Sequence, residues 1–261
     1  MTSVLAGALG FLGAMIAHDL AAQVLGDQPL RPFSGTCPRC GNSRGWTHRT
    51  CTGCGRSIGR ELVGLVVAVV FAIAFANTIG MVWALVPYLG FLTLTLALGV
   101  TDVDALRIVD RLNLRGTVLL VGALGLAALA DGAGSAFLRG VLGGAAYFVG
   151  TNLVFLLVRG RGFGYGDVKL SVQLGVFTAY ISWGTLGWSV FLTAMIGGVL
   201  SIAVVLAGAV TRLRRKGSGT EAPEGSIRDS MKVELPYGPS MILGSWIAIA
   251  VAGLGAFPIP T

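Results

Sequence analysis

Long apolar runs separated by short polar segments dominate the hydropathy pattern of this chain. A helix needs about 20 mostly apolar residues to cross the hydrocarbon core of a bilayer, and eight runs approach that length. They cover residues 4–25, 62–79, 81–100, 117–130, 136–158, 168–182, 184–210 and 239–256. The pattern therefore predicts an all-α, polytopic integral membrane protein with about eight transmembrane helices.

The composition also indicates a protein embedded in a lipid bilayer. Of the 261 residues, 54% are hydrophobic and 12% are charged, whereas a soluble domain usually carries about a quarter charged residues. This balance excludes an ordinary soluble enzyme, a disordered protein and a secreted disulfide scaffold. The net charge is +7. In a membrane protein the basic residues set the orientation in the bilayer, so this charge does not indicate a nucleic-acid partner, and none is expected.

Eighteen of the nineteen lysine and arginine residues fall in four segments between the predicted spans. These eighteen are Arg31, Arg39, Arg44, Arg49, Arg56 and Arg60; Arg107, Arg111 and Arg115; Arg159, Arg161 and Lys169; and Arg212, Arg214, Arg215, Lys216, Arg228 and Lys232. With eight spans all four segments lie on one side of the membrane, which the positive-inside rule makes the cytoplasm. Both termini are then outside, and Arg139 alone falls elsewhere.

The spans divide the chain into three parts. Residues 1–25 form the first transmembrane helix, which we expect to be retained because it lacks the basic segment and the cleavage site of a secretory signal. Residues 26–61 form a cytoplasmic loop, and residues 62–261 form a membrane core of about seven helices with a polar cytoplasmic linker at 212–235.

All four cysteines lie in the first cytoplasmic loop. Cys37 and Cys40 form one Cys-x-x-Cys pair, Cys51 and Cys54 form a second, and ten residues separate the two pairs. Two such pairs place four thiolates at the corners of a tetrahedron, the geometry that structural zinc prefers. Two disulfides are the alternative, which the reducing cytoplasm disfavours. The spacing therefore predicts a small zinc-binding loop.

Acidic residues at the ends of two spans are the candidates for catalysis, because carboxylates at the membrane are costly. Asp102 and Asp104 follow the third apolar run, and Asp167 follows Gly164 and Gly166 at the start of the sixth. Both segments lie at the same predicted membrane face. If the helix continues through the first segment, Asp102 and Asp104 point about 200° apart, so only one faces the bundle. Asp102 is nearer the apolar run and is the better candidate.

Two carboxylates from different spans that lie close together share a proton, and one then acts as a general base on water while the other acts as an acid. No competing nucleophile is evident, because the sequence contains neither a Gly-x-Ser-x-Gly elbow nor a His-Glu-x-x-His helix. The alternative is that these acids are helix-end charges that pair with Arg107, Arg111 and Lys169.

Several motifs resemble those of the type IV prepilin leader peptidases, the bacterial branch of the Gly-x-Gly-Asp intramembrane aspartyl proteases. Residues 164–170 match the Gly-x-Gly-Asp-x-Lys motif of that family. The paired cysteines after the first span, the acidic stretch after a later span and residues 235–239 before the last helix follow in the same order. The resemblance covers the chain from about Cys37 to the final helix and implies the same eight-span topology.

The resemblance implies removal of a short basic leader from prepilins or pseudopilins at the cytoplasmic face of the bacterial inner membrane. The catalytic aspartates carry over onto Asp102 and Asp167. Supporting positions of the motifs are Gly164, Gly166, Lys169 and Asp110. Lys169 is expected either to tune the charge near Asp167 or to anchor the loop. Neither the particular pilin substrate nor the oligomeric state follows from the sequence.

Many members of that family also methylate the new amino terminus with S-adenosylmethionine, using the region around the cysteines. Here the insert between the cysteine pairs is short, and residues 15–19 replace the Asn-rich signature of the first helix, which argues against methyltransferase activity. Three alternatives stay open. They are a bifunctional peptidase and N-methyltransferase, a non-enzymatic membrane scaffold with a zinc knuckle, and a presenilin-like protease of general substrates.

Overall fold

The computed structural model describes residues 2–25, 59–80, 82–105, 108–158, 164–217 and 237–253. Within these residues the regular structure consists of eight helices. They are α1 (Thr2–Leu25), α2 (Gly59–Ile79), α3 (Leu85–Ala105), α4 (Asp110–Ala130), α5 (Gly134–Leu157), α6 (Tyr165–Ile181), α7 (Trp183–Gly217) and α9 (Gly238–Ala252). The prediction of an all-α chain is confirmed for this part of the protein.

Six of these helices, α1 to α5 and α7, are long and apolar enough to cross a membrane. The other two are shorter than the roughly 20 residues of a typical span, with 17 residues in α6 and 15 in α9. Most residues of α6 and α9 are buried against other helices. The multi-pass membrane protein is therefore confirmed, with six candidate spans among the described residues and two shorter helices, α6 and α9, packed inside the bundle.

Several helices extend beyond the predicted apolar runs. α4 begins at Asp110 and not at residue 117, because the polar side chains of Asn113 and Thr117 are buried in the bundle. α7 continues to Gly217, past the predicted end at residue 210 and into the segment predicted as a linker. Its last turns are rich in Arg, Leu and Lys, which favour helix although they are not all apolar. α2 begins at Gly59, three residues before the predicted run, and ends with that run at Ile79.

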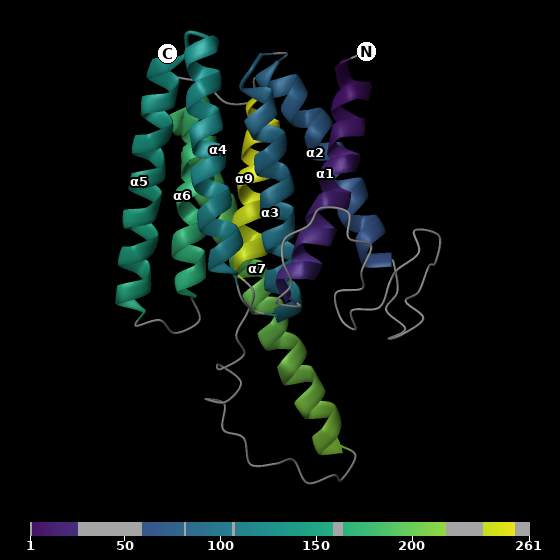
Figure 1. Cartoon of the computed structure of the whole chain (residues 1–261). Helices are drawn as coiled ribbons and strands as arrows, with labels where there is room; N and C mark the ends of the chain where they lie inside the picture. Colours follow the sequence, from purple (N-terminus) through teal and green to yellow (C-terminus); the bar gives the residue numbers. More distant parts are fainter. Residues whose placement is uncertain are drawn as a thin grey trace.

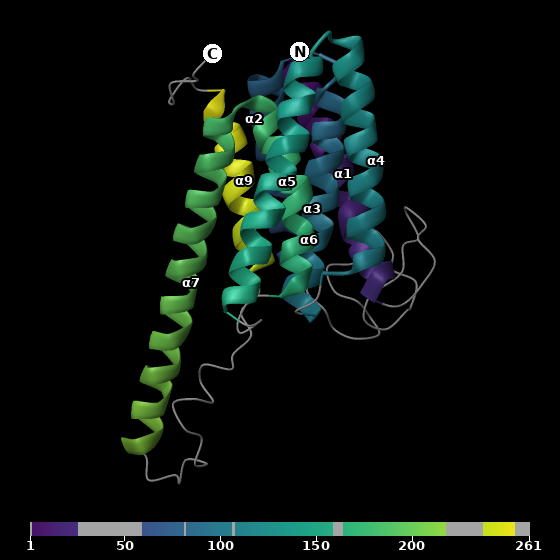
Figure 2. The same ribbon diagram turned by 90° about the vertical axis from the view of Figure 1, so that its left-hand side faces the viewer.

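The helices lie side by side in one bundle, and α7 reaches beyond it at one end (Figures 1 and 2). α1 begins and α9 ends at the opposite end of the bundle (Figure 1). The end of α3 and the starts of α4, α6 and α9 all lie at the end from which α7 projects (Figure 1). The helix ends that flank the predicted basic segments thus share one end of the molecule.

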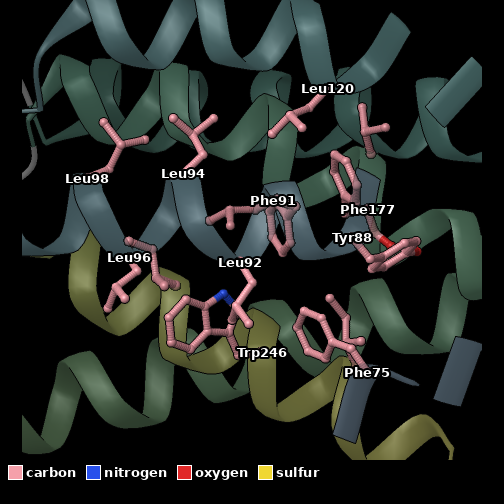
Figure 3. Close-up of a cluster of buried hydrophobic side chains, with 14 of the residues drawn as sticks. Phe75, Tyr88, Phe91, Leu92, Leu94, Leu96, Leu98, Leu120, Phe177 and Trp246 are labelled. Atoms are coloured by element: carbon pink, nitrogen blue, oxygen red, sulfur yellow. The ribbon is translucent and has the colours of Figure 1, made fainter. Parts of the chain in front are cut away.

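A cluster of aromatic side chains joins α3 to α6 and α9 in the core (Figure 3). Phe91 stacks on Phe177 with 4.4 Å between ring centroids. The Tyr88 hydroxyl donates a hydrogen bond to the carbonyl oxygen of Phe177 at 2.6 Å, and Trp246 Nε1 donates to Thr95 Oγ1 at 3.0 Å. Buried polar groups need such partners, so these contacts fix the two short helices against α3.

Small residues let α5 and α6 pack closely. A Cβ atom at Gly143 would overlap the Cβ of Ala179, and one at Gly144 would lie 2.6 Å from Val176 Cγ2. On the other helix, a Cβ at Gly175 would lie 2.7 Å from the Gly143 carbonyl oxygen. Small residues at helix interfaces are a main source of van der Waals packing in membranes. This contact holds α6 in register with α5.

Arg139, the one basic residue outside the four basic segments, binds the end of α6. Its guanidinium donates hydrogen bonds to the carbonyl oxygens of Ala179, Tyr180 and Ile181 at 2.8, 2.6 and 2.8 Å. The last carbonyls of a helix have no partner within the helix and carry partial negative charge. Arg139 therefore has a structural role that explains its exception to the charge pattern.

Candidate active site

Asp102 lies near the end of α3 and points into the bundle. The helix continues past it to Ala105. Positions 102 and 104 therefore lie about 200° apart around the helix axis, so only one of them faces the bundle. The Asp102 side chain is 6% exposed, and its Oδ2 has no hydrogen-bond partner among the described residues. A buried carboxyl oxygen without a partner is unusual, so this position is a strong functional candidate.

Asp167 lies in the first turn of α6 and is also 6% exposed. Its Oδ2 accepts a hydrogen bond from the backbone N–H of Gly164 at 3.2 Å, and its own N–H donates to the Gly164 carbonyl oxygen at 3.1 Å. A carboxylate in this position satisfies free backbone donors and favours the start of a helix. The Gly-x-Gly-Asp motif thus builds the start of α6 and directs its aspartate inward.

Three segments converge beside Asp102. The backbone of Gly166 in α6 packs on Ile108, where a Cβ at position 166 would lie 3.0 Å from Ile108 Cβ. Gly238 at the start of α9 packs on the same residue, where its Cβ would lie 3.3 Å from Ile108 Cδ1 and 2.8 Å from Asp102 Oδ2. At Gly166 the motif glycine therefore allows the backbone of α6 to approach Ile108 closely.

The two carboxyls act on each other electrostatically. Asp167 precedes the apolar run that begins at residue 168 and lies outside the six spans. Burial, and secondly the charge of Asp102, raise the pKa of Asp167 to about 7, while the hydrogen bond from Gly164 opposes this shift. Two carboxyls coupled in this way favour a state in which one is protonated and the other is ionised.

Lys169 pairs with Asp110 and with neither of the two buried aspartates in the described structure. Lys169 Nζ lies 2.6 Å from Asp110 Oδ2, and the two side chains are 36% and 61% exposed. The same Nζ lies 5.2 Å from the centre of the Tyr165 ring. Of the two expected roles for Lys169, this geometry supports anchoring, because the pair ties the start of α4 to the start of α6.

Buried polar side chains that the sequence analysis missed lie between α4 and α6. Gln173 Nε2 donates a hydrogen bond to Asn113 Oδ1 at 3.0 Å, and Thr117 Oγ1 donates to the same oxygen at 3.4 Å. The signal was the four-residue spacing of Asn113 and Thr117, which places both on one face of a helix. This contact fixes the position of α4 against the helix that carries Asp167.

Two tyrosines, also missed, lie near Asp167. Tyr147 of α5 is buried, and both Asp167 and Tyr237 act on it electrostatically. Tyr237 directly precedes α9, and its ring packs on Gly197 of α7, where a Cβ would lie 2.5 Å from Tyr237 Cε2. Burial, and secondly the charge of Asp167, raise the pKa of Tyr237. Only the family motif at 235–239 pointed to this residue.

The predicted zinc ligands Cys37, Cys40, Cys51 and Cys54 lie outside the described residues, as does the side chain of Asp104. Within the described ranges, no group of three or more His, Cys, Asp or Glu side chains is placed to hold a metal ion. The zinc site therefore stays a prediction.

The fold and the site together define a multi-pass helical membrane protein with a buried aspartate pair at one end of its bundle. Residues 89–202, which include Asp102 and Asp167, match the type IV leader peptidase family. This match confirms the resemblance to that family which the sequence motifs indicated.

Three relatives named prepilin leader peptidase/N-methyltransferase are similar to most of the chain. The relative from Pseudomonas aeruginosa is 29% identical over 229 residues, which cover 82% of this chain and 70% of the relative. The relative from Aeromonas hydrophila is 27% identical over 213 residues, which cover 78% and 63%. The relative from Aeromonas salmonicida is 27% identical over 233 residues, which cover 82% and 69%. No solved structure matches the chain.

Proposed function

We propose that this protein is a membrane aspartic endopeptidase that removes the short basic leader peptide from type IV prepilins or prepilin-like pseudopilins. The proposal is carried by the two buried carboxyls, Asp102 of α3 and Asp167 of α6, which lie at the same end of the bundle and interact electrostatically. The family match supports the same reaction. Supporting roles fall to Gly164, Gly166, Lys169 and Asp110.

The two carboxyls divide the steps of peptide hydrolysis. The ionised carboxyl accepts a proton from water as the water oxygen attacks the scissile carbonyl carbon. The protonated carboxyl gives its proton to the carbonyl oxygen, so that a neutral gem-diol forms. As the C–N bond breaks, the first carboxyl protonates the leaving nitrogen. A hydroxyl of the gem-diol then returns a proton to the second carboxyl, which restores the starting state.

The charge pattern supports a cytoplasmic position for this chemistry. The starts of α4 and α6 and the end of α3 flank the basic segments, and the aspartates lie at these helix ends. By the positive-inside rule this end faces the cytoplasm of the bacterial inner membrane, with both termini outside. An apolar helix of the substrate in the bilayer would then present its leader at the same face.

A structural zinc ion held by Cys37, Cys40, Cys51 and Cys54 completes the proposal. The donor set fits zinc because two Cys-x-x-Cys pairs supply four thiolates. Elemental analysis of purified protein should find about one zinc per chain and less than half of that in Cys37→Ser, since removing one of four ligands opens the site. Equal zinc in both proteins would contradict this assignment.

A second activity, N-methylation of the new amino terminus with S-adenosylmethionine, is the alternative that the relatives favour, because their names include N-methyltransferase. The short insert between the cysteine pairs and residues 15–19 argue against it in this chain. We therefore propose the peptidase as the main function and treat methylation as a separate outcome of the same experiment.

The test is cleavage of a prepilin in liposomes by the wild type, Asp102→Asn and Asp167→Asn, with S-adenosylmethionine present. Each substitution keeps the side-chain size and removes the titrating group, so both variants should be folded and inactive. Asp131→Asn is the matched control, because Asp131 lies at the other end of the bundle and accepts hydrogen bonds from Trp83 and Ala84. Cleavage at the wild-type rate by either dyad variant would exclude the dyad. The mass of the product reports methylation.

A further inference from the structure

The start of α9 approaches the Asp102 carboxyl more closely than any residue with a side chain would allow. Gly238 is the first residue of α9 and is buried. A Cβ atom there would lie 2.8 Å from Asp102 Oδ2 and 3.3 Å from Asp102 Cγ. Real Cβ atoms essentially never come this close to another heavy atom. Glycine is therefore required at this position for the present contact.

One backbone N–H group in the first four residues of α9 makes no hydrogen bond to the Tyr237 carbonyl oxygen and is free to interact with Asp102. Of the first four residues of α9, Pro239 has no N–H, and Ser240 and Met241 donate to the Tyr237 carbonyl oxygen at 3.0 and 3.2 Å. This leaves the N–H of Gly238, which interacts with the Asp102 carboxyl. The free N–H groups at a helix start also carry partial positive charge, which favours a carboxylate.

The Asp102 carboxyl has few other partners to hold it. Its Oδ2 is buried and makes no hydrogen bond to any described residue. Among the described residues, the carboxyl that acts on it electrostatically is Asp167 of α6, which repels it when both are ionised. Lys169 and Asp110 pair with each other, and His18 of α1 faces α2. Within the part of the chain that the structure describes, the contact from α9 is therefore the favourable one at this carboxyl.

We propose that Gly238 is a positioning residue of the aspartate pair, which brings the free N–H at the start of α9 against Asp102 and so fixes the orientation of its carboxyl. The inference rests on the proposed peptidase function. It assigns a role to the segment that enters α9, which otherwise contributes no group to the hydrolysis. It makes no distinction between the two aspartates as acid or base.

The test compares Gly238→Ala with Gly99→Ala. Gly99 lies on α3, one turn before Asp102, and a Cβ there would make an ordinary 3.4 Å contact with Ile242 of α9. Gly238→Ala should lower kcat about tenfold or more with little change in KM, because small misplacement of a reacting group is costly. The acidic limb of its pH–rate profile should move to higher pH, since the carboxylate loses a favourable donor. Gly99→Ala should stay within about threefold of wild type, as expected for an ordinary contact.

Equal losses in both variants, or a wild-type profile in Gly238→Ala, would overturn the proposal. If Gly238→Ala fails to fold, Ile108→Ala in the same chain removes the neighbouring Ile108 Cδ1 contact at 3.3 Å and leaves the Asp102 contact in place. Recovery of folding without recovery of kcat then supports positioning, and recovery of both overturns it.

A second readout does not depend on cleavage. The carboxyl band of Asp102, assigned in infrared pH-difference spectra by its loss in Asp102→Asn, should titrate at higher pH in Gly238→Ala than in wild type. An unchanged midpoint would overturn the positioning role. Failure of the wild type to cut any prepilin, with the band still shifted, would reject the peptidase while leaving the contact with α9 in place.

Discussion

Asp167 links the chemistry of the site to the stability of the fold. Burial and the charge of Asp102 raise its pKa to about 7, whereas an unfolded chain keeps a carboxyl near its usual value of about 4. The folded state therefore binds this proton more tightly, so its stabilising effect is complete at low pH and is lost as pH rises from about 4 to about 7.

Asp167→Asn should remove this dependence. Asn keeps an oxygen for the Gly164 N–H but does not titrate, so the variant should lose less Tm than wild type between about pH 4.5 and about pH 7.5. Scanning fluorimetry in detergent measures both slopes over the same pH range. Parallel curves for wild type and Asp167→Asn would show that the buried carboxyl is not the source of the dependence.

The Lys169–Asp110 pair distinguishes anchoring from charge tuning. Exposed ion pairs contribute about 0–1 kcal/mol, and these side chains are 36% and 61% exposed. Lys169→Gln, Asp110→Asn and the double variant should therefore show similar small losses of Tm, with a coupling below about 1 kcal/mol. Cleavage should fall only a few-fold in all three, as expected for loss of one exposed anchor. A much larger loss in Lys169→Gln alone would mean that Lys169 acts directly on the aspartates.

Among the elements, the contact between α5 and α6 should be the most sensitive to added volume. Gly143→Val would force its side chain into Ala179, and overpacking typically costs about 1–3 kcal/mol. Gly150→Val is a matched control on the same helix, because a Cβ at Gly150 meets nothing within 4 Å. Gly143→Val should lower both the Tm in detergent and the yield from membranes. Equal behaviour of the two variants would contradict the close packing.

The helices themselves were largely predictable from the sequence, because hydropathy identifies the apolar segments that lie in lipid or in the protein core. The start of α4 was not, since Asn113 is polar and was assigned to a loop, although its hydrogen bond with Gln173 of α6 satisfies it inside the bundle. The short helix α6 was predicted as a span. It has only 17 residues, and neighbouring helices bury most of them. Partners that are distant in sequence decide both cases.

At the scale of the whole molecule, the site depends on helix ends that are far apart in the chain. Asp102 and Asp167 were identifiable because acids are few and the glycine motif is specific. Ile108 and Gly238 were not, because an apolar residue and a glycine carry no chemical signal until α3, α6 and α9 meet. Tyr147 was missed for the same reason, since it lies within an apolar run of α5.

The orientation of the bundle is the last prediction, and the native cysteines test it. If the basic end faces the cytoplasm, all four cysteines lie inside, because they belong to the segment between α1 and α2. A membrane-impermeant maleimide should leave the wild type unlabelled in intact spheroplasts and label it after lysis with a chelator, which frees zinc-bound thiolates.

Ser135→Cys supplies the opposite marker. Ser135 is an exposed residue at the start of α5, at the end of the bundle opposite the aspartates (Figure 1), so this variant should be labelled in intact spheroplasts. Labelling of the wild type before lysis, with no further labelling in Ser135→Cys, would show that the protein has the opposite orientation in the membrane. The aspartates would then face away from a cytoplasmic leader, and the proposed reaction would fail on topology even with its two carboxyls correctly placed.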